Sequence, residues 1–141
     1  MKPIESAPFA APLLNWSLAV AIIAGLGGLC LAPVPARAAG PGVVVKLTDE
    51  LKFAPASVTV KVGDAVEWRN DSVLVHTVTD DPQKAAKAAD SALPEGARPF
   101  GSGNLKPGAT YKRTFTVPGT YRYFCIPHEA AGMVATVQVT K

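Results

Sequence analysis

The sequence is poor in residues that form disulfide bonds or bind soft metal ions: its 141 residues include two Cys, two His and two Met. Such numbers allow neither a framework of disulfide bonds nor a His-rich metal-binding tract. Charged residues make up 18% of the chain and form no basic run, which argues against nucleic-acid binding. We also find no internal repeat, so a repeat architecture is not expected.

The longest apolar stretch lies close to the N-terminus and runs from about Leu18 to Ala32. A weakly basic start with Lys2 precedes it, and Pro33-Val34-Pro35 interrupts it before the A-x-A pattern Ala36-Arg37-Ala38. This order is typical of a secretory signal peptide with its cleavage site. Residues 1–38 are therefore predicted to be a cleaved signal, and the protein is expected in the periplasm or an equivalent lumenal or extracytoplasmic compartment.

The alternative for this segment is an uncleaved membrane anchor. Counted from Leu13 to Ala32 it has 20 residues, which is long enough to cross a bilayer. Asn15, Trp16 and Ser17 weaken the start of such a span, and the A-x-A pattern favours removal. Cleavage would leave residues 39–141, or 103 residues, which is enough for one domain.

The predicted mature domain has a single thiol, Cys125, because Cys30 belongs to the signal. One thiol cannot form an internal disulfide. A lone thiol in an oxidising compartment is a liability that a bound metal removes, although a buried and inert Cys is also common. Without Lys2, Glu5 and Arg37 the domain has 12 basic and 10 acidic residues, and this charge of +2 indicates no particular partner surface.

The His, Cys and Met residues of this domain form one pattern. Cys125, His128 and Met133 follow the spacing C-x2-H-x4-M, and His76 lies 49 residues upstream of Cys125. A thiolate and two imidazoles in a plane, with a weak axial thioether, describe a type 1 (blue) copper site for electron transfer. We therefore predict that these four residues hold one copper ion that cycles between Cu(I) and Cu(II).

Other interpretations of the pattern are less complete. A C-x2-H pair also occurs in zinc sites, but a structural zinc ion needs more Cys or His than this domain has. Taken singly, each His can be an ordinary residue and Met133 a core side chain, but this leaves the shared pattern unexplained. A dinuclear copper centre needs two Cys, and four protein ligands leave no open position for a substrate. We therefore expect no enzymatic activity.

Alternation of apolar and polar residues predicts a series of short β-strands, which turn signals such as Gly63-Asp64 and Pro118-Gly119 separate. The expected strands cover residues 43–47, 57–62, 65–70, 73–79, 110–117, 120–125 and 133–140. This pattern predicts an all-β fold, an antiparallel β-sandwich with Greek-key connections. Residues 126–132 then form a loop between two strands, which presents Cys125, His128 and Met133 at one edge. Pro127 stiffens this loop, and Gly132 lets the backbone turn.

One segment departs from the strand pattern. Residues 81–90 are predicted to form a short helix that Asp81 caps and that begins with Pro82. Its Ala-rich sequence has no large apolar side chains that could pack in a core, so we expect a helical excursion on the surface. Residues 94–108 are rich in Gly and Pro and are predicted to be loop.

The stretch Tyr121–Val134, with its Cys-Ile-Pro-His-Glu-Ala-Ala-Gly-Met core, resembles the cupredoxins of the plastocyanin/pseudoazurin type. Phe53-Ala54-Pro55, the strands of residues 58–70 and the position of Asn70 before His76 are also similar, and the likeness covers residues 43–141. It implies a copper-binding β-sandwich that carries single electrons between larger redox proteins, with His76, Cys125, His128 and Met133 as the ligands.

The chain departs from the plastocyanin pattern beside the upstream His. Plastocyanins usually have Pro before and Asn after it, and Val75 and Thr77 stand there instead. The Asn links the two ligand loops by hydrogen bonds, and the Thr77 hydroxyl is the available substitute. The acidic patches of plant plastocyanins are not apparent, so a plant partner is not implied.

The expected function is thus that of a small, monomeric electron carrier. Transient docking near His128 to cytochromes or membrane electron-transfer complexes suits a carrier that must release its partner quickly. A periplasmic copper chaperone or store is the alternative, and a metal-free structural sandwich is another.

Overall fold

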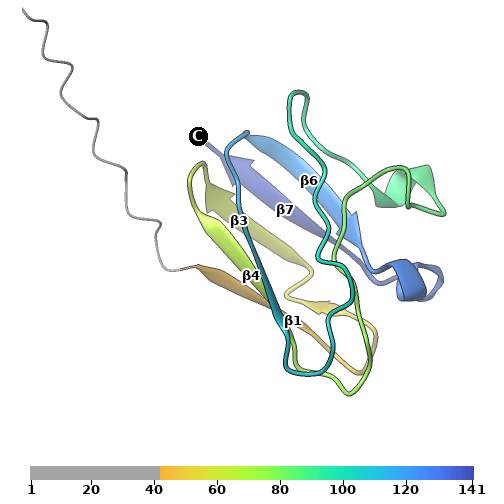
Figure 1. Ribbon diagram of the computed structural model, residues 1–141. Helices are drawn as coiled ribbons and strands as arrows, with labels where there is room; N and C mark the ends of the chain where they lie inside the picture. The colour runs from red at the N-terminus through yellow and green to blue at the C-terminus, as the bar shows by residue number, and fades with distance from the viewer. Residues whose placement is uncertain (1–41) are drawn as a thin grey trace, which may run out of the picture. The chain divides into compact units, whose positions relative to one another are not determined.

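The computed structural model describes residues 42–141, which fold as two β-sheets that face each other (Figure 1). One sheet has the order β2-β1-β4-β5 and consists of β1 (Val43–Leu47), β2 (Phe53–Ala54), β4 (Ala65–Asn70) and β5 (Thr110–Thr114). The other has the order β3-β7-β6 and consists of β3 (Ser57–Lys61), β6 (Gly119–Phe124) and β7 (Val134–Thr140). The predicted all-β sandwich is confirmed.

The pairing within the sheets is mixed, whereas an antiparallel arrangement was expected. β1 pairs with β4 in parallel, and so does β3 with β7, while the other three pairs are antiparallel. The parallel pairs arise because the chain passes from one sheet to the other between β2 and β3 and returns between β3 and β4. β1 and β4, which are neighbours in their sheet, therefore run in the same direction.

The core lies between the sheets and is centred on Trp68, whose side chain is fully buried. Its ring lies 5.3 Å from that of Tyr123 and 5.7 Å from that of Phe100, in the range of favourable aromatic pairs. Strand alternation supplies the rest of the core, since every second residue of β3 and β7 points inward. Each large apolar side chain that is buried in this way stabilises the fold by about 1.5–3 kcal/mol.

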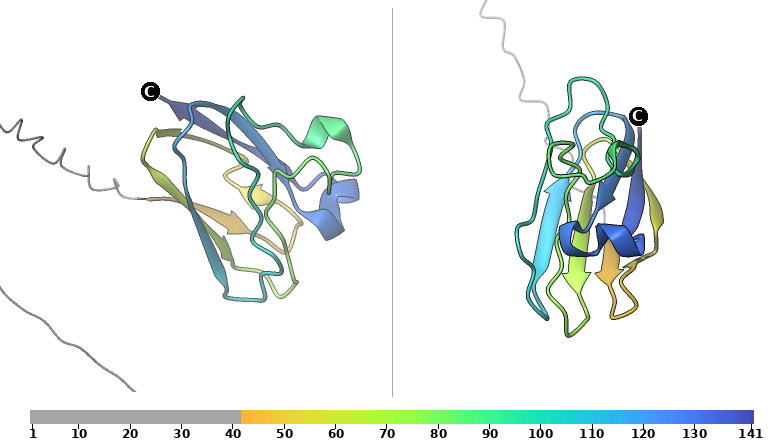
Figure 2. Two further views of the ribbon diagram at one scale, coloured as in Figure 1. Left: turned by 45° about the horizontal axis from the view of Figure 1, so that its top comes forward. Right: turned by 90° about the vertical axis from the view of Figure 1, so that its right-hand side faces the viewer.

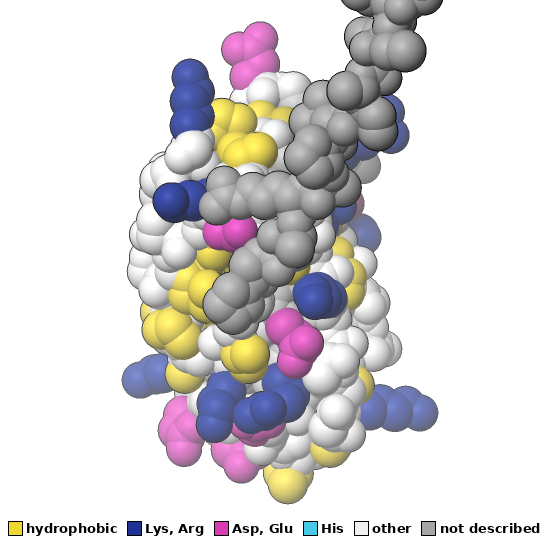
Figure 3. All heavy atoms as spheres, turned by 90° about the vertical axis from the view of Figure 1, so that its left-hand side faces the viewer, with side chains coloured by type: hydrophobic (Ala, Val, Ile, Leu, Met, Phe, Trp, Pro, Cys, Tyr) yellow, Lys and Arg dark blue, Asp and Glu magenta, His cyan; other side chains and the backbone are white. Residues whose placement is uncertain are grey.

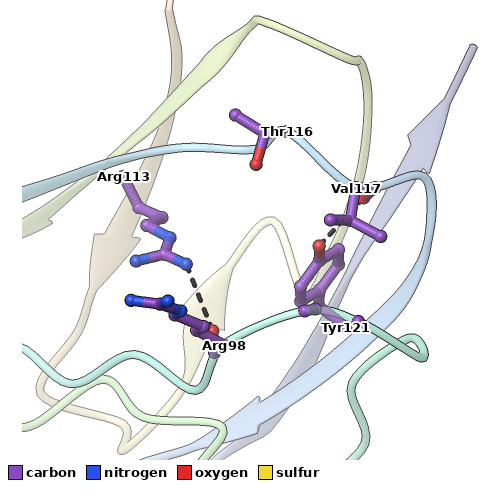
Figure 4. Close-up of a pocket in the computed structure, with 7 residues that line it drawn as sticks. Arg98, Arg113, Thr116, Val117 and Tyr121 are labelled. Carbon is purple, nitrogen blue, oxygen red and sulfur yellow. Dashed lines mark hydrogen bonds between the residues drawn. The ribbon is translucent and has the colours of Figure 1, made fainter.

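The connection between β5 and β6 lies at the end of β6 that is remote from Cys125. The hydroxyl of Tyr121 donates a 2.9 Å hydrogen bond to the carbonyl of Val117, and Arg113 Nη2 donates one of 3.2 Å to the carbonyl of Arg98 (Figure 4). These bonds flank a hollow of about 190 Å³. The bond of Tyr121 ties the first half of β6, the strand that leads into Cys125, to the connection before it.

The predicted strand at 73–79 is wrong. His76 and Thr79 make only isolated bridges, His76 to Leu105 and Thr79 to Gly101 and Phe124. The reason is local competition for the backbone, because Asn70 Nδ2 donates to the Leu74 carbonyl and Ser72 Oγ accepts the N–H of Leu74. This segment is therefore a loop, and the side chain of Val73 is 79% exposed.

The predicted helix over 81–90 is also wrong, since only Ala88–Asp90 form one 3₁₀ turn, η1. Asp81 does accept the N–H of Gln83, as an N-cap would. The N–H groups of Ala86 and Lys87 instead donate to the carboxylate of Glu129, so they are not available for helical bonds. The segment is a surface excursion, as expected, and lies beside η2 (Ile126–Ala131) (Figure 1).

The predicted signal segment, residues 1–38, lies outside the described residues. Within residues 42–141, no helix has the length and hydropathy that a membrane crossing requires. On the face that Figure 3 shows, basic and acidic side chains lie among one another, which agrees with the small net charge.

Candidate metal centre

The four predicted ligands belong to two connecting segments that meet at one end of the sandwich. His76 lies in the loop after β4, Cys125 directly follows β6, His128 belongs to η2, and Met133 directly precedes β7. Figure 2 shows η2 across this end of the molecule. Gly132 closes η2 with φ of 81°, the left-handed conformation that favours glycine, so the expected turn before Met133 is confirmed.

Three of the ligand atoms converge. His76 Nδ1 lies 3.7 Å from Cys125 Sγ, His128 Nδ1 lies 3.4 Å from Cys125 Sγ, and the two Nδ1 atoms are 3.2 Å apart. One ligand atom from each of the three residues thus lies within 4.8 Å of the other two. The lone pairs of two imidazoles and a thiol therefore face one small volume.

These distances fit a metal ion at the centre of the triangle. Bonds of about 2.0 Å to imidazole nitrogen and about 2.3 Å to thiolate sulfur, at 120° to one another, separate the nitrogens by about 3.5 Å and nitrogen from sulfur by about 3.7 Å. Each measured distance is within a few tenths of an ångström of these values. The donor set combines one soft thiolate with two imidazoles, as copper prefers.

Met133 is held against the same group through its backbone. Its carbonyl accepts the N–H of Cys125 at 3.0 Å, and its own N–H donates to the carbonyl of His128 at 3.2 Å. The side chain is fully buried. Met133 thus lies beside two of the converging residues, on the strand that follows them.

A buried hydrogen-bond network orients His76. Its Nε2 lies 2.8 Å from Ser72 Oγ, which also accepts the N–H of Leu74 and lies 2.9 Å from Asn70 Oδ1. The hydroxyl has one proton, and the carbonyl oxygen of Asn70 can only accept it. Ser72 Oγ is then free to accept a proton from Nε2, which leaves Nδ1 of His76 as the lone-pair donor toward the centre.

Thr77 connects the two ligand loops. Its N–H donates to Cys125 Sγ over 3.2 Å, and its Oγ1 accepts the N–H of Ile126 over 2.8 Å. The Thr77 hydroxyl therefore forms the link that the sequence predicted in place of the usual Asn. Ile126 belongs to the loop that contains His128. Thr77 therefore holds this loop and the loop of His76 in a fixed relative position.

Burial shifts the pKa values of two predicted ligands in opposite directions. It raises the pKa of the Cys125 thiol, so the thiolate forms when a metal ion replaces the proton. It lowers the pKa of His76, and the charge of His128 lowers it further. The lowered pKa keeps His76 neutral at neutral pH, which is the form that binds metal.

His128 is the more accessible of the two imidazoles. His76 is fully buried, whereas His128 is partly exposed in η2. Ile126, Pro127, Ala130 and Ala131 around it are all exposed, and Ile126 is 44% exposed. His128 is therefore the predicted ligand nearest the solvent, and a small apolar surface surrounds it.

The profile of copper binding proteins of the plastocyanin/azurin family matches residues 42–140. The chain belongs to this family. It is a cupredoxin of the plastocyanin type, and its cofactor is one copper ion at a type 1 site.

Relatives and solved structures agree with this assignment. The plastocyanin of Scenedesmus fuscus is 35% identical over 100 residues, which cover 69% of this chain and 98% of that one. The plastocyanin of Nostoc punctiforme is 35% identical over 137 residues, with 92% and 95% covered. A structure of an oxidised amicyanin variant is 30% identical, with a TM-score of 0.55 over 74% of this chain and 88% of that one.

Sequence reasoning missed two residues near the cupredoxin site, Ser72, which contacts His76, and Glu129, which directly follows His128. Ser72 lies four positions before His76, and a short hydroxyl side chain at this spacing was the available signal. Glu129 is a charged residue among small ones directly after His128, yet it is 4% exposed. Its partners are 42 and 43 positions away, so no local pattern revealed them.

Proposed function

We propose that this protein carries single electrons between redox partners and that His76, Cys125, His128 and Met133 are the four copper ligands. The observation that carries the proposal is the convergence of two imidazole nitrogens and one sulfur at separations of 3.2–3.7 Å. The plastocyanin relatives support the same role. Bound copper supplies a one-electron couple between Cu(I) and Cu(II).

The protein's part in this role is to keep the ligands in place while the charge changes. His76 is oriented by Ser72, Cys125 accepts the N–H of Thr77, and the loop of His128 is tied to Thr77 through Ile126. Ligands that are fixed by such bonds move little on oxidation or reduction, which favours fast electron transfer. Four protein ligands also leave no position for a substrate, so we propose no catalytic activity.

Electrons enter and leave through the exposed edge of His128. The surface around it consists of apolar side chains, most of them small. The exposed residues are Ile126, Pro127, Ala130 and Ala131. Val73, Leu74 and Val75 in the loop of His76 add further exposed apolar side chains. A small apolar surface suits brief docking of a monomer to cytochromes or membrane electron-transfer complexes.

The proposed location is the periplasm or an equivalent compartment outside the cytoplasm. The basis is the sequence of residues 1–38, with its apolar run and A-x-A pattern. Beyond that segment the chain has one Cys, which is a proposed copper ligand and so is protected from oxidation. Mass spectrometry of the protein isolated from its native host tests this, because an N-terminus at Ala39 is expected and an intact Met1 would contradict it.

The visible absorption spectrum of the copper-loaded protein tests the ligand set. An intense thiolate-to-copper band is expected in the oxidised form, and it should disappear on reduction and in Cys125→Ala. A matched control is Ser102→Ala, a partly buried change outside the ligand loops that should keep the band. A colourless Cu(II) form of the wild-type protein would overturn the proposal.

The electron self-exchange rate then separates a carrier from a copper chaperone or store. A carrier keeps its ligand geometry and exchanges electrons rapidly between its two oxidation states. A slow exchange, together with ready transfer of copper to a chelator, would favour the copper-handling alternative.

A further inference from the structure

Glu129 is an acidic side chain that is almost fully buried, directly after His128. Its residue is 4% exposed, and none of the four ion pairs among residues 42–141 includes it. A buried carboxylate is costly unless hydrogen bonds compensate its charge. The partners of Glu129 must therefore explain why a charged residue is present at this position.

The partners are two consecutive backbone N–H groups of the surface excursion. Oε2 accepts the N–H of Ala86 and Oε1 accepts the N–H of Lys87, each at 2.9 Å. Both oxygens of one carboxylate are thus used, in charge-assisted bonds that are stronger than neutral ones. These bonds join η2, which contains His128, to a segment more than 40 positions away.

The excursion is itself fastened to β6, the strand that leads into Cys125. Before it, Thr79 exchanges two backbone hydrogen bonds with Phe124, of 3.1 and 2.8 Å. After it, Ala92 exchanges two with Arg122, also of 3.1 and 2.8 Å, and Asp90 lies 3.6 Å from Arg122. Residues 79–92 therefore form a strap whose two ends are on β6 and whose middle contacts Glu129. Figure 2 shows this segment beside η2.

This arrangement restrains His128. The His128 N–H donates to the Cys125 carbonyl at 3.1 Å, and the N–H of Gly132 donates to the Glu129 carbonyl at 2.8 Å. Those bonds lie inside the loop, and the Thr77 hydroxyl holds the loop from outside only at its start, at Ile126. The strap supplies a restraint from outside the loop, at the residue next to the partly exposed ligand.

We propose that Glu129 is a positioning residue that holds His128 beside Cys125 and His76 by fixing η2 to the strap of residues 79–92. The proposal rests on the proposed ligand role of His128, and it assigns a function to the excursion that the electron-carrier role leaves unexplained. Without the two bonds, η2 gains freedom to shift and His128 leaves the metal more readily.

Three substitutions test the proposal. Glu129→Gln keeps the size of the side chain but removes the charge and points an N–H₂ group at one of the two donors. Glu129→Asp keeps the charge but is too short to reach both N–H groups, and it also serves if the first variant fails to fold. Glu95→Gln is the matched control, because it removes one acidic charge from an exposed loop position.

Three measurements on the copper-loaded protein decide. In both Glu129 variants the amide hydrogens of Ala86 and Lys87 should exchange with solvent at least about tenfold faster. Copper loss to an excess of chelator should also become about tenfold faster, in line with the effect of removing groups that orient metal ligands. The electron paramagnetic resonance spectrum of Cu(II) should change in both variants, and Glu95→Gln should behave as wild type in all three respects.

Several outcomes would overturn the inference. Faster amide exchange with unchanged copper loss and an unchanged spectrum would mean that Glu129 holds only the excursion. Unchanged exchange at Ala86 and Lys87 would mean that the carboxylate contacts are not made. An effect confined to Glu129→Gln would assign the role to charge instead of position. Failure of the proposed function is a separate result, because the wild-type protein itself would then lack the blue band.

Discussion

Thr77 and Cys125 are 48 positions apart in the sequence, yet the N–H of Thr77 donates to Cys125 Sγ over 3.2 Å. The same residue accepts the N–H of Ile126 through its hydroxyl, over 2.8 Å. Two bonds from one residue thus connect the loop of the upstream ligand to the loop of the other three. This relationship explains how the chain can dispense with the Asn that plastocyanins usually have at this position.

Thr77→Val tests how much the hydrogen bond between the Thr77 hydroxyl and the N–H of Ile126 stabilises the fold. The substitution keeps the shape of the side chain and the backbone bond to sulfur, but it leaves the N–H of Ile126 without its acceptor. We expect a loss of about 1 kcal/mol in the free energy of unfolding, the usual net contribution of one hydrogen bond, because this bond is only partly buried. Urea unfolding of the copper-loaded protein measures it. Thr59→Val, on the exposed face of β3, is the control, and an equal loss in both would contradict the assignment.

Ser72→Ala should weaken copper binding through His76. The variant removes the oxygen that lies 2.8 Å from Nε2, so the imidazole loses the partner that fixes its tautomer and orientation. A decrease of about 10–100-fold in copper affinity is expected, as for other residues that orient metal ligands. Competition with a chelator measures this. Ser102→Ala loses bonds to Val78 and Gly103 instead, and a similar decrease in that variant would count against the role of Ser72.

Met133→Leu should change the reduction potential more than the stability. The side chain is fully buried, and a swap of Met for Leu nearly conserves volume, so the unfolding free energy should fall by less than about 1.5 kcal/mol. If the Met133 thioether is a copper ligand, its loss would leave Cu(II) less stabilised relative to Cu(I), so the potential should rise. Cyclic voltammetry measures it. A potential equal to that of the wild type would exclude Met133 from the ligand set.

Asp80→Asn should alter how stability depends on pH. Asp80 is fully buried, its Oδ1 accepts the N–H of Phe100 at 2.7 Å, and its Oδ2 has no partner among the described residues. Burial raises its pKa from 3.8 to about 6. Between these values the folded protein holds a proton that the unfolded chain has released.

The contribution of protonated Asp80 to stability is therefore complete below pH 3.8 and is lost as the pH rises through about 6. The unfolding free energy of the wild type minus that of Asp80→Asn should decrease over this interval and stay constant above it. Unfolding of the two proteins in parallel at several pH values from about 4 to 8 measures the difference. A constant difference, or one that increases with pH, would show that the carboxyl is ionised throughout.

The strands of β1 and β4 have the bounds that the sequence predicted, 43–47 and 65–70, because alternation of apolar and polar residues is a local signal. The ligand types were also evident from the sequence, since Cys125, His128 and Met133 are close together and His76 is the one other His. Residue chemistry and short spacings therefore determined the family, the sandwich and the candidate ligands.

The tertiary structure alone decided which side chains meet across long separations. His76 approaches Cys125 over 49 positions because the two sheets bring their loops to one end, and no spacing rule shows this. The strand expected at 73–79 and the helix expected at 81–90 fail because Asn70, Ser72 and Glu129 take the backbone groups that those elements need. Local propensity is weak compared with such buried hydrogen bonds, so the packed chain overrode it at the positions that support the copper site.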